Sequence, residues 1–228
     1  MPGRCWASWQ GRVGDSDLHG HLAAQAVFGA AVEACSAEGQ ALELQAGAVF
    51  IPPGALHRVR PAQQGLLVFI EPGCRMQAVL PPELQQRIEA GLSLCDPSDR
   101  GDALRRPDRA WPGWRAAWQC PAVGWDPDWL LAVRTLVDRM LPDGVVRLDR
   151  LAGPMGQSGE RFRHVFAERM GLPVRRYVLW RRLRLAVQGL QQGAGVTEAA
   201  MEAGFADAAH FGRTLHRHFG LNARRLFS

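Results

Sequence analysis

The first third of the chain alternates short apolar runs with turn-forming residues. Between Val27 and about Ile70, four runs are predicted to be strands: AVFGAAVEA, ALELQ, AVFIPPG and GLLVFIEPG. Glycine and proline separate these runs, so we expect turns at Glu38-Gly39, Ala46-Gly47, Pro53-Gly54 and Gln64-Gly65. Evenly spaced short strands are typical of a small β-sandwich or barrel. The pattern therefore predicts a β domain over residues 1–80.

A helical linker region is predicted over residues 81–143. After Pro81 and Pro82, apolar side chains recur at helical spacing at Leu84, Ile88 and Leu92. Residues 95–125 are rich in Pro, Gly, Asp, Arg and Trp and predict a connector. Three tryptophans in this connector share one helical face, which favours packing over ligand binding: Trp111, Trp114 and Trp118.

A further helix closes the linker region. Asp126 can cap its first turn, and Pro127 suits the first helical position. The apolar pattern continues through WLLAVRTLVDRML and stops at Pro142-Asp143-Gly144. From Val145 onward the sequence is predicted to be helical throughout.

A helix-turn-helix pattern opens the last third of the chain. Gly153-Pro154-Met155-Gly156 supplies a turn after a short helix, and Ser158 is placed to cap the next helix, over 159–170. Phe162 and Phe166 lie one turn apart and predict its buried side. On a helical wheel, four side chains project to the opposite side: Glu160, Arg163, His164 and Ala167.

The same pattern recurs near the C-terminus, and one long helix starting at Pro173 joins the two copies. A short helix beginning at Thr197 ends at Gly204, and another helix is expected from about Asp207 to Phe219. Its predicted core stripe is Phe211, Leu215 and Phe219. Nearly opposite that stripe lie His210, Arg213 and Arg217, whereas His216 and His218 are assigned no contact.

Charge is distributed unevenly along the chain. All 27 basic residues are arginines. Residues 1–143 carry a net charge of −3, and residues 144–228 carry a net charge of +8. A basic helical module beside an acidic half indicates a separate part that meets a polyanion. An α-helix fits the major groove of DNA, and arginine can bind guanine through two hydrogen bonds.

The last ~85 residues resemble the DNA-binding domain of the AraC/XylS family of bacterial transcription regulators. The matching segments are LAGPMGQSGERFRHVF, GLPVRRYVLWRRLRLAVQGL and AAMEAGFADAAHFGRTLHRHFG. They follow the family pattern LAxxxGxSxxxLxRxF, then G…P…Y…RL…A…L, then AxxxGFxdxxxFxRxFxxxxG. The chain departs from it at His164, where the family usually has Arg, and at Leu215, where it usually has Phe.

The resemblance implies a set of DNA contacts. Base edges would be contacted by Glu160, Arg163 and His164 in the first unit and by Ala209, His210 and Arg213 in the second. Ser158, Arg161 and Arg217 would contact phosphates. Ala209 has no hydrogen-bonding group and would touch only a thymine methyl. The implied partner is double-stranded promoter or operator DNA.

The N-terminal part resembles the two motifs of a cupin barrel, G…HxHx3–4E and GxxxxPxGxxH. The corresponding segments are GDSDLHGHLAAQ and GAVFIPPGALH. In metal-binding cupins two His, one Glu and a later His converge on one ion. The matching positions here are His19, His21, Gln25 and His57, and glutamine is a poorer ligand than glutamate. Sensor domains of the regulator family commonly keep such a barrel without metal, for a small organic effector, and both interpretations stay open.

Together these patterns predict an α+β protein. A small N-terminal cupin-like β-barrel or sandwich, over 1–80, would sense a ligand or dimerise. A C-terminal all-α domain, over 144–228, would bind DNA with two helix-turn-helix units joined by a long helix. The alternative is a metal-binding cupin sensor, or a cupin metalloenzyme with a DNA-binding appendage.

Several further expectations follow from this hypothesis. We expect a cytoplasmic ligand-responsive regulator that is not an enzyme and has no membrane segment. Its effector would be an unknown small molecule or a metal, and no cofactor is implied beyond a divalent metal in the cupin-like domain. Homodimerisation stays open as an expectation, and an activator would also contact RNA polymerase.

Overall fold

The computed structural model describes residues 6–35, 41–45, 47–74, 80–93 and 126–221. The chain divides into two compact units, 1–121 with 217–221 and 122–216 with 222–228. The predicted connector over 95–125, with its three tryptophans, and the predicted turn at Glu38-Gly39 lie outside the described residues.

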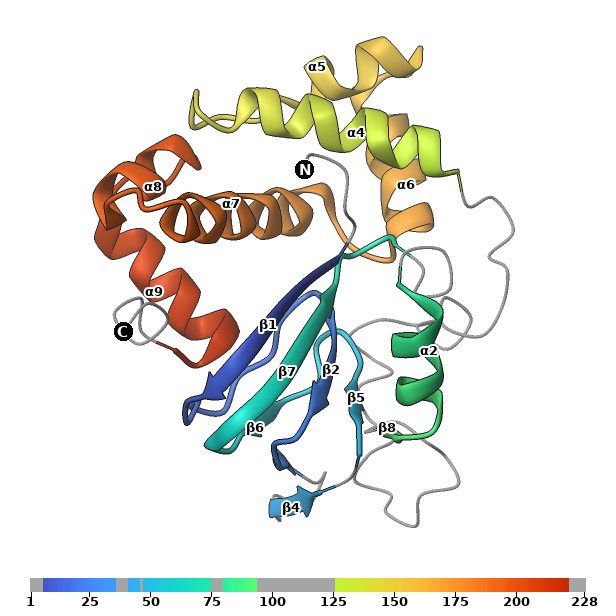
Figure 1. Cartoon of the computed structure of the whole chain (residues 1–228). Coiled ribbons are helices and arrows are strands. Elements are labelled where there is room, and N and C mark those ends of the chain that lie inside the picture. Colours follow the sequence, from blue (N-terminus) through green and yellow to red (C-terminus); the bar gives the residue numbers. More distant parts are fainter. Residues whose placement is uncertain (1–5, 36–40, 46, 75–79, 94–125, 222–228) are drawn as a thin grey trace. The chain divides into compact units, whose positions relative to one another are not determined.

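The first unit is built from two β-sheets (Figure 1). Its elements are β1 (Trp6–Val13), β2 (Ala24–Phe28), β3 (Val32–Cys35), β4 (Ala41–Leu44), β5 (Val49–Ile51), β6 (His57–Val59), β7 (Ala62–Ile70), α2 (Pro82–Glu89) and β8 (Leu92–Ser93). One sheet has the strand order β1-β7-β2-β5-β8, and the other has the order β4-β3-β6. All pairs are antiparallel except β5 with β8.

Apolar side chains on alternating strand positions form two cores around the larger sheet. On one face, Val27 and Ile51 pack with Val32 and Val59 of the smaller sheet. On the other face, Ala26 and Phe28 of β2 pack in a cluster that includes Ile88 of α2. Since successive strand residues point to opposite faces, Gln25 shares the face of Val27 and therefore points between the two sheets.

One predicted turn in this unit is wrong. Gln64 and Gly65 lie within β7, a strand of nine residues that pairs with β1 along its length. Gly65 stands opposite Gly11, and a side chain at Gly65 would press into the Val13 side chain. This glycine therefore serves close packing between strands and not a change of direction. Strands β1, β6 and β8 were not among the predicted strands.

The second unit is helical. Its elements are α4 (Pro127–Met140), α5 (Leu148–Ala152), the 3₁₀ turn η3 (Gly153–Met155), α6 (Gly159–Met170), α7 (Val174–Gln191), α8 (Val196–Glu202) and α9 (Ala208–Phe219). The last three residues of α9, 217–219, are grouped with the first unit. Figure 1 shows α7 as the long helix between the α5–α6 and α8–α9 pairs. The α+β class is confirmed, with two sheets in the first unit and helices in the second.

The predicted helix starts are confirmed at atomic detail. The Asp126 carboxylate accepts a hydrogen bond from the Trp129 backbone N–H at 2.9 Å, which caps α4. The Ser158 hydroxyl accepts one from the Arg161 N–H at 3.3 Å and caps α6. These bonds satisfy backbone donors that have no partner inside the helix.

Helix α4 packs within the second unit, although the sequence placed it in the 81–143 linker region. The Trp129 ring lies 6.0 Å from the Phe166 ring of α6, and that ring lies 5.5 Å from Tyr177 of α7. A part-buried ion pair adds a polar link: Arg181 of α7 donates two hydrogen bonds to the Asp138 carboxylate, at 2.9 and 2.7 Å. The Arg181 side chain is only 6% exposed, so losing its partner would leave a buried charge.

Each helix pair turns at a glycine in the left-handed backbone region. Gly156 follows η3 with φ +65°, and Gly204 follows α8 with φ +79°. A methyl group on Gly156 would meet no atom within 4 Å, whereas one on Gly204 would overlap the backbone carbonyl of Leu141 at the end of α4. The second turn therefore combines a positive φ with a close approach between two backbones.

The two glycines provide a matched pair of substitutions. Gly156→Ala should cost about 1–2 kcal/mol, because an alanine in the left-handed region is strained. Gly204→Ala should cost that amount and about 1–3 kcal/mol more, because α4 must also move away from the added methyl group. Urea denaturation of the full chain, followed by circular dichroism, measures both. Equal losses in the two variants would contradict the close approach of Gly204 to Leu141.

Candidate nucleic-acid interface and a histidine cluster

The first candidate DNA-reading helix is α6. Its predicted contact residues are all exposed: Ser158, Glu160, Arg161, Arg163 and His164. Phe162, Phe166 and Met170 are buried and hold the helix against its neighbours. The exposed side is mixed in charge, since Glu160 and Glu168 accompany the two arginines. This helix therefore offers both hydrogen-bond donors and acceptors.

The second candidate helix, α9, has a more cationic outer side. Ala209, Arg213 and Arg217 are exposed, and Phe211, Thr214 and Leu215 are buried. His210 is only half-buried, and its ring packs edge-on against Phe205 at 5.3 Å between centroids. His216, to which the helical wheel assigned no contact, is exposed one turn from Arg213. The exposed face thus extends toward His216, which the sequence analysis missed.

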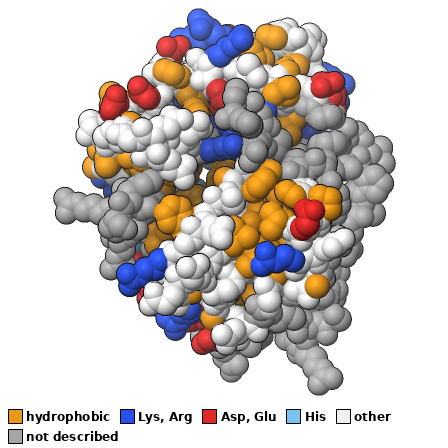
Figure 2. Space-filling model, viewed as in Figure 1, with side chains coloured by type: hydrophobic (Ala, Val, Ile, Leu, Met, Phe, Trp, Pro, Cys, Tyr) orange, Lys and Arg blue, Asp and Glu red, His pale blue; other side chains and the backbone are white. Residues whose placement is uncertain are grey.

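The surface of the second unit is not uniformly basic. Figure 2 shows acidic and basic side chains interspersed over the region that α4 and α5 occupy in the same view of Figure 1. Acidic residues of α4 and α5 include Asp128 and Asp149, and basic ones include Arg139 and Arg150. Neighbouring charges of opposite sign largely cancel, so this surface should attract DNA phosphates less than the cationic side of α9 does.

In the first unit, the two histidine motifs lie side by side. The backbone N–H of His19 donates to the carbonyl of His57 at 3.0 Å, and the N–H of His57 donates to the carbonyl of His19 at 2.9 Å. This isolated antiparallel bridge sets the two residues directly opposite each other. The carbonyl of His21 accepts a hydrogen bond from Gly54, two residues after the first proline of the second motif. The predicted convergence of both motifs is therefore present in the structure.

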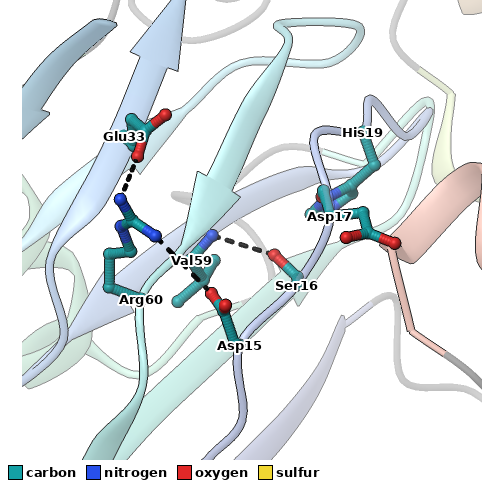
Figure 3. Close-up of polar contacts among 7 residues, drawn as sticks. All are labelled: Asp15, Ser16, Asp17, His19, Glu33, Val59 and Arg60. Atoms are coloured by element: carbon teal, nitrogen blue, oxygen red, sulfur yellow. Dashed lines mark hydrogen bonds and ion pairs between the residues drawn. The ribbon is translucent and has the colours of Figure 1, made fainter.

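The segment that carries His19 is fastened to β6 by further polar contacts (Figure 3). The Ser16 hydroxyl accepts a hydrogen bond from the Val59 backbone N–H at 2.9 Å. Arg60, next along the chain, forms an ion pair with Asp15 of the segment at 4.0 Å and another with Glu33 of β3 at 2.7 Å. Ser16 is buried, so its bond to Val59 is protected from water. These contacts fix the position of the segment before its histidines begin.

Three imidazole rings and one amide form a compact buried cluster. The His57 ring lies 4.2 Å from the His19 ring and 5.0 Å from the His21 ring, centroid to centroid. The Gln25 Oε1 atom lies 2.8 Å from Nε2 of His21 and 3.0 Å from Nε2 of His57. All four side chains are at most 5% exposed. The structure therefore brings together every residue that the cupin resemblance indicated.

Burial keeps these histidines neutral. Desolvation, and after it the neighbouring His21, lowers the pKa of His19 to about 4. Desolvation also lowers the pKa of His21, although its hydrogen bond to Gln25 acts against the shift. The pKa of His57 is well below its usual value, through desolvation and then through His21 and His19. Neutral imidazole is the form that binds metal ions.

The donor set fits a divalent cation. One ring nitrogen from each histidine lies within 4.8 Å of those of the other two. Imidazole nitrogens suit zinc, copper and nickel, and an amide oxygen can complete the set. The same buried side chains could also line a cavity for an organic effector, so the geometry alone is compatible with either ligand.

The comparisons with known proteins bear first on the C-terminal part. Residues 151–228 match the family model described as a helix-turn-helix domain. The resemblance to AraC/XylS regulators is therefore confirmed for this region, which is an AraC-type helix-turn-helix domain, a DNA-binding type of domain. No curated protein sequence matches the chain.

Solved structures of ToxT from Vibrio cholerae are similar over nearly the whole chain. One, from strain O395, has a TM-score of 0.58 and 9% sequence identity, covering 98% of this chain and 97% of that one. A second contains (E)-4-(8-methylnaphthalen-1-yl)but-3-enoic acid, with a TM-score of 0.55, 9% identity and 98% coverage of both chains. A third, from strain SCE256, contains an unsaturated fatty acid, with a TM-score of 0.55, 10% identity and coverage of 97% and 94%. At such low identity, these similarities establish the fold.

No helix in the described ranges is long and apolar enough to cross a membrane.

The lowered pKa of His19 predicts how the first unit responds to acid. Because the unfolded state takes up a proton near pH 6.5 and the folded state only near pH 4, stability is lost as the pH falls between these values. The shifted pKa of His19 alone should lower the free energy of unfolding by about 2 kcal/mol between pH 7 and pH 5. Urea denaturation of chelator-treated protein at both pH values measures the loss.

The control for this prediction is His19→Asn, which keeps a short amide but cannot titrate. Its loss of stability between pH 7 and pH 5 should be smaller by about the contribution of His19, with His21 and His57 supplying the remainder. Identical pH dependence in the wild type and the variant would show that His19 is not held in its neutral form by the fold.

Proposed function

We propose that the protein is a ligand-responsive transcription regulator that reads promoter DNA with α6 and α9. The observation that carries the proposal is the AraC-type helix-turn-helix domain of residues 151–228. The two helix pairs, α5–α6 and α8–α9, each present an exposed polar helix face opposite a buried side, which includes Phe162 and Phe166 in α6 and Phe211 and Leu215 in α9. Their connection through α7 suits two successive major-groove segments about one helical turn apart.

The two helices would divide the work of recognition. Arg213 can donate two hydrogen bonds to a guanine edge, and Arg217, one turn further along α9, would contact a phosphate. On α6, Arg163 offers the same guanine contact, and Glu160 can accept a hydrogen bond from a cytosine amino group. Ser158 and Arg161 would hold phosphates at the start of α6, where the helix dipole also favours an anion.

The first unit would be the sensor. ToxT, whose fold this chain shares, holds an unsaturated fatty acid in one solved structure and a naphthalenyl butenoic acid in another. These ligands support a small organic effector in this chain, and the three clustered histidines support a metal effector. Effector binding would change how the domains are oriented or paired and so shift the population that can engage both DNA segments. The proposal includes no catalytic step.

Arg213 provides the test of the reading face. Preferred sites for the full chain are first selected from random DNA, and binding is then measured on the best site at fixed salt. Arg213→Ala should weaken binding about 5- to 150-fold and relax the preference at one base pair, because a bidentate guanine contact is lost. Arg217→Ala should weaken binding on all sequences alike and reduce the salt dependence.

Arg139→Ala is the matched control, because it removes an exposed arginine from α4 and not from α6 or α9. Its binding should stay close to that of the wild type, apart from a small general loss of positive charge. If Arg213→Ala binds the selected site as Arg139→Ala does, the assignment of the α9 reading face is wrong. If the full chain shows no retention of DNA even at low salt, the proposed function itself fails.

A further inference from the structure

Arg182 of α7 lies where three segments of the second unit meet. Its Nη2 group donates a hydrogen bond to the Gly144 carbonyl at 2.7 Å, in the turn between α4 and α5. The turn between α8 and α9 is close by, because a methyl group on Gly204 would lie 3.4 Å from Nε of Arg182 and would overlap the Leu141 carbonyl. One side chain therefore lies beside both the end of α4 and the turn that precedes α9.

The positive charge of Arg182 suits this junction. Leu141 and Gly144 follow the last residue of α4, and the backbone carbonyls at the end of a helix carry partial negative charge. Burial lowers the pKa of Arg182, but a guanidinium keeps its charge at neutral pH. The hydrogen bond to Gly144 is therefore charge-assisted, which makes it stronger than a bond between two neutral groups.

The Nε–H group of Arg182 is buried and has no hydrogen-bond partner within the described part of the chain. A buried donor without a partner destabilises a fold, and an apolar side chain at this position would bury no such donor. Proteins depart from this rule mainly at positions that serve function. The arginine is thus better explained by what it connects than by local stability.

The junction gives the two helix pairs a second connection. The first connection runs through α7: Tyr177 packs on Phe166 of α6 at 5.5 Å between ring centroids. Further along α7, a methyl group on Gly189 would lie 3.3 Å from the Ala199 side chain of α8. The second connection runs through α4, which packs on α6 near its start and reaches the α8–α9 turn at its end. Two connections prevent a rotation of one pair against the other that a single connection would leave free.

We propose that Arg182 is a positioning residue: it holds the end of α4 against the α8–α9 turn and thereby fixes the separation and angle of α6 and α9. Its role on DNA rests on the proposed function, whereas the fixed arrangement of the two helices does not. Arg182 contacts no base in this role and acts through the Gly144 carbonyl and the turn at Gly204. The protein would then select the spacing between two DNA segments in addition to their base sequence.

The spacing between the two DNA segments provides the test. The segments are located by footprinting on the site selected by the full chain, and one base pair is then inserted between them. The insertion turns the second groove segment by about 35° and moves it by about 3.4 Å along the axis. Wild-type affinity should fall about 10- to 100-fold, because one helix gives up its base contacts.

Arg182→Met is the informative variant, because it removes the charge and the donors but keeps an apolar stem of similar length. It should bind the original site about 10-fold more weakly than the wild type, since fewer molecules hold both helices in position. Its affinities for the original and the lengthened site should differ by less than about 3-fold, because the two helices can now adjust independently.

Two further variants separate positioning from general stability. Arg182→Lys keeps a cation that can donate to the Gly144 carbonyl, so its spacing discrimination should return to within about 3-fold of the wild type. Asp138→Ala also removes a polar contact between α4 and α7, but the partner of Asp138 is Arg181 and not the α8–α9 turn. It should lower the free energy of unfolding and leave the spacing discrimination unchanged. All proteins are compared at a temperature at which circular dichroism shows them folded.

A measurement without DNA tests the arrangement of the helices directly. Spin labels replace Ala167 of α6 and Ala209 of α9, which are both exposed, and non-canonical amino acids carry the labels because the chain has five cysteines. Pulsed electron paramagnetic resonance should give a narrow distance distribution in the wild type and in Asp138→Ala. The distribution in Arg182→Met should be at least about twice as broad.

Two results would overturn the proposal. One is an Arg182→Met protein that keeps the spacing discrimination and the distance distribution of the wild type. The other is an Asp138→Ala protein that loses both as far as Arg182→Met does, since any weakened contact between α4 and α7 would then have the same effect. If the wild type binds no DNA even at low salt, the proposed regulator fails, while the distance distributions still decide the positioning role of Arg182.

Discussion

A polar group that is taken out of water must keep a hydrogen-bond partner, and this constraint organises both units of the protein. In the first unit, the Nδ1 atoms of three buried histidines each face a backbone carbonyl, which fixes the rings and turns their other nitrogens inward. In the second unit, the buried Arg181 side chain donates to Asp138 and so fastens α7 to α4. The histidine bonds are local, since each joins residues two positions apart, whereas the pairing of Arg181 with Asp138 joins segments 43 residues apart.

The sequence predicted the helical unit well because its signals are local. Capping residues such as Ser158, and aromatic stripes such as Phe162 with Phe166, act within one or two turns of a helix. The strands were predicted less completely, since β1 is largely exposed along its length and has no clear alternation, and β6 has only three residues. Gly65 was taken for a turn because the sequence does not show that Val13 packs beside it.

Among the side-chain contacts, those that belong to a recognisable motif were predicted, and those between distant residues outside any motif were not. The convergence of His19, His21 and His57 was predicted because the two segments that carry them resemble the two motifs of a cupin barrel. The pairing of Arg181 with Asp138 was not predicted, because 43 residues separate the partners and neither belongs to a motif. On α9 the wheel correctly placed Phe211 and Leu215 on the buried side and Arg213 on the exposed side, yet it could not show that Phe205 covers part of the His210 ring.

The charge on the two candidate reading helices implies that they contribute differently to DNA binding. Phosphate attraction does not depend on sequence and scales with the number of cations at the backbone. Helix α9 presents Arg213 and Arg217 on its exposed face, so it can supply much of this attraction. Helix α6 has Glu160 beside its arginines. The phosphates repel this carboxylate, so it favours binding only at sites where a cytosine amino group donates a hydrogen bond to it. Affinity would therefore come mainly from α9, and α6 would reject sites that lack the matching base pair.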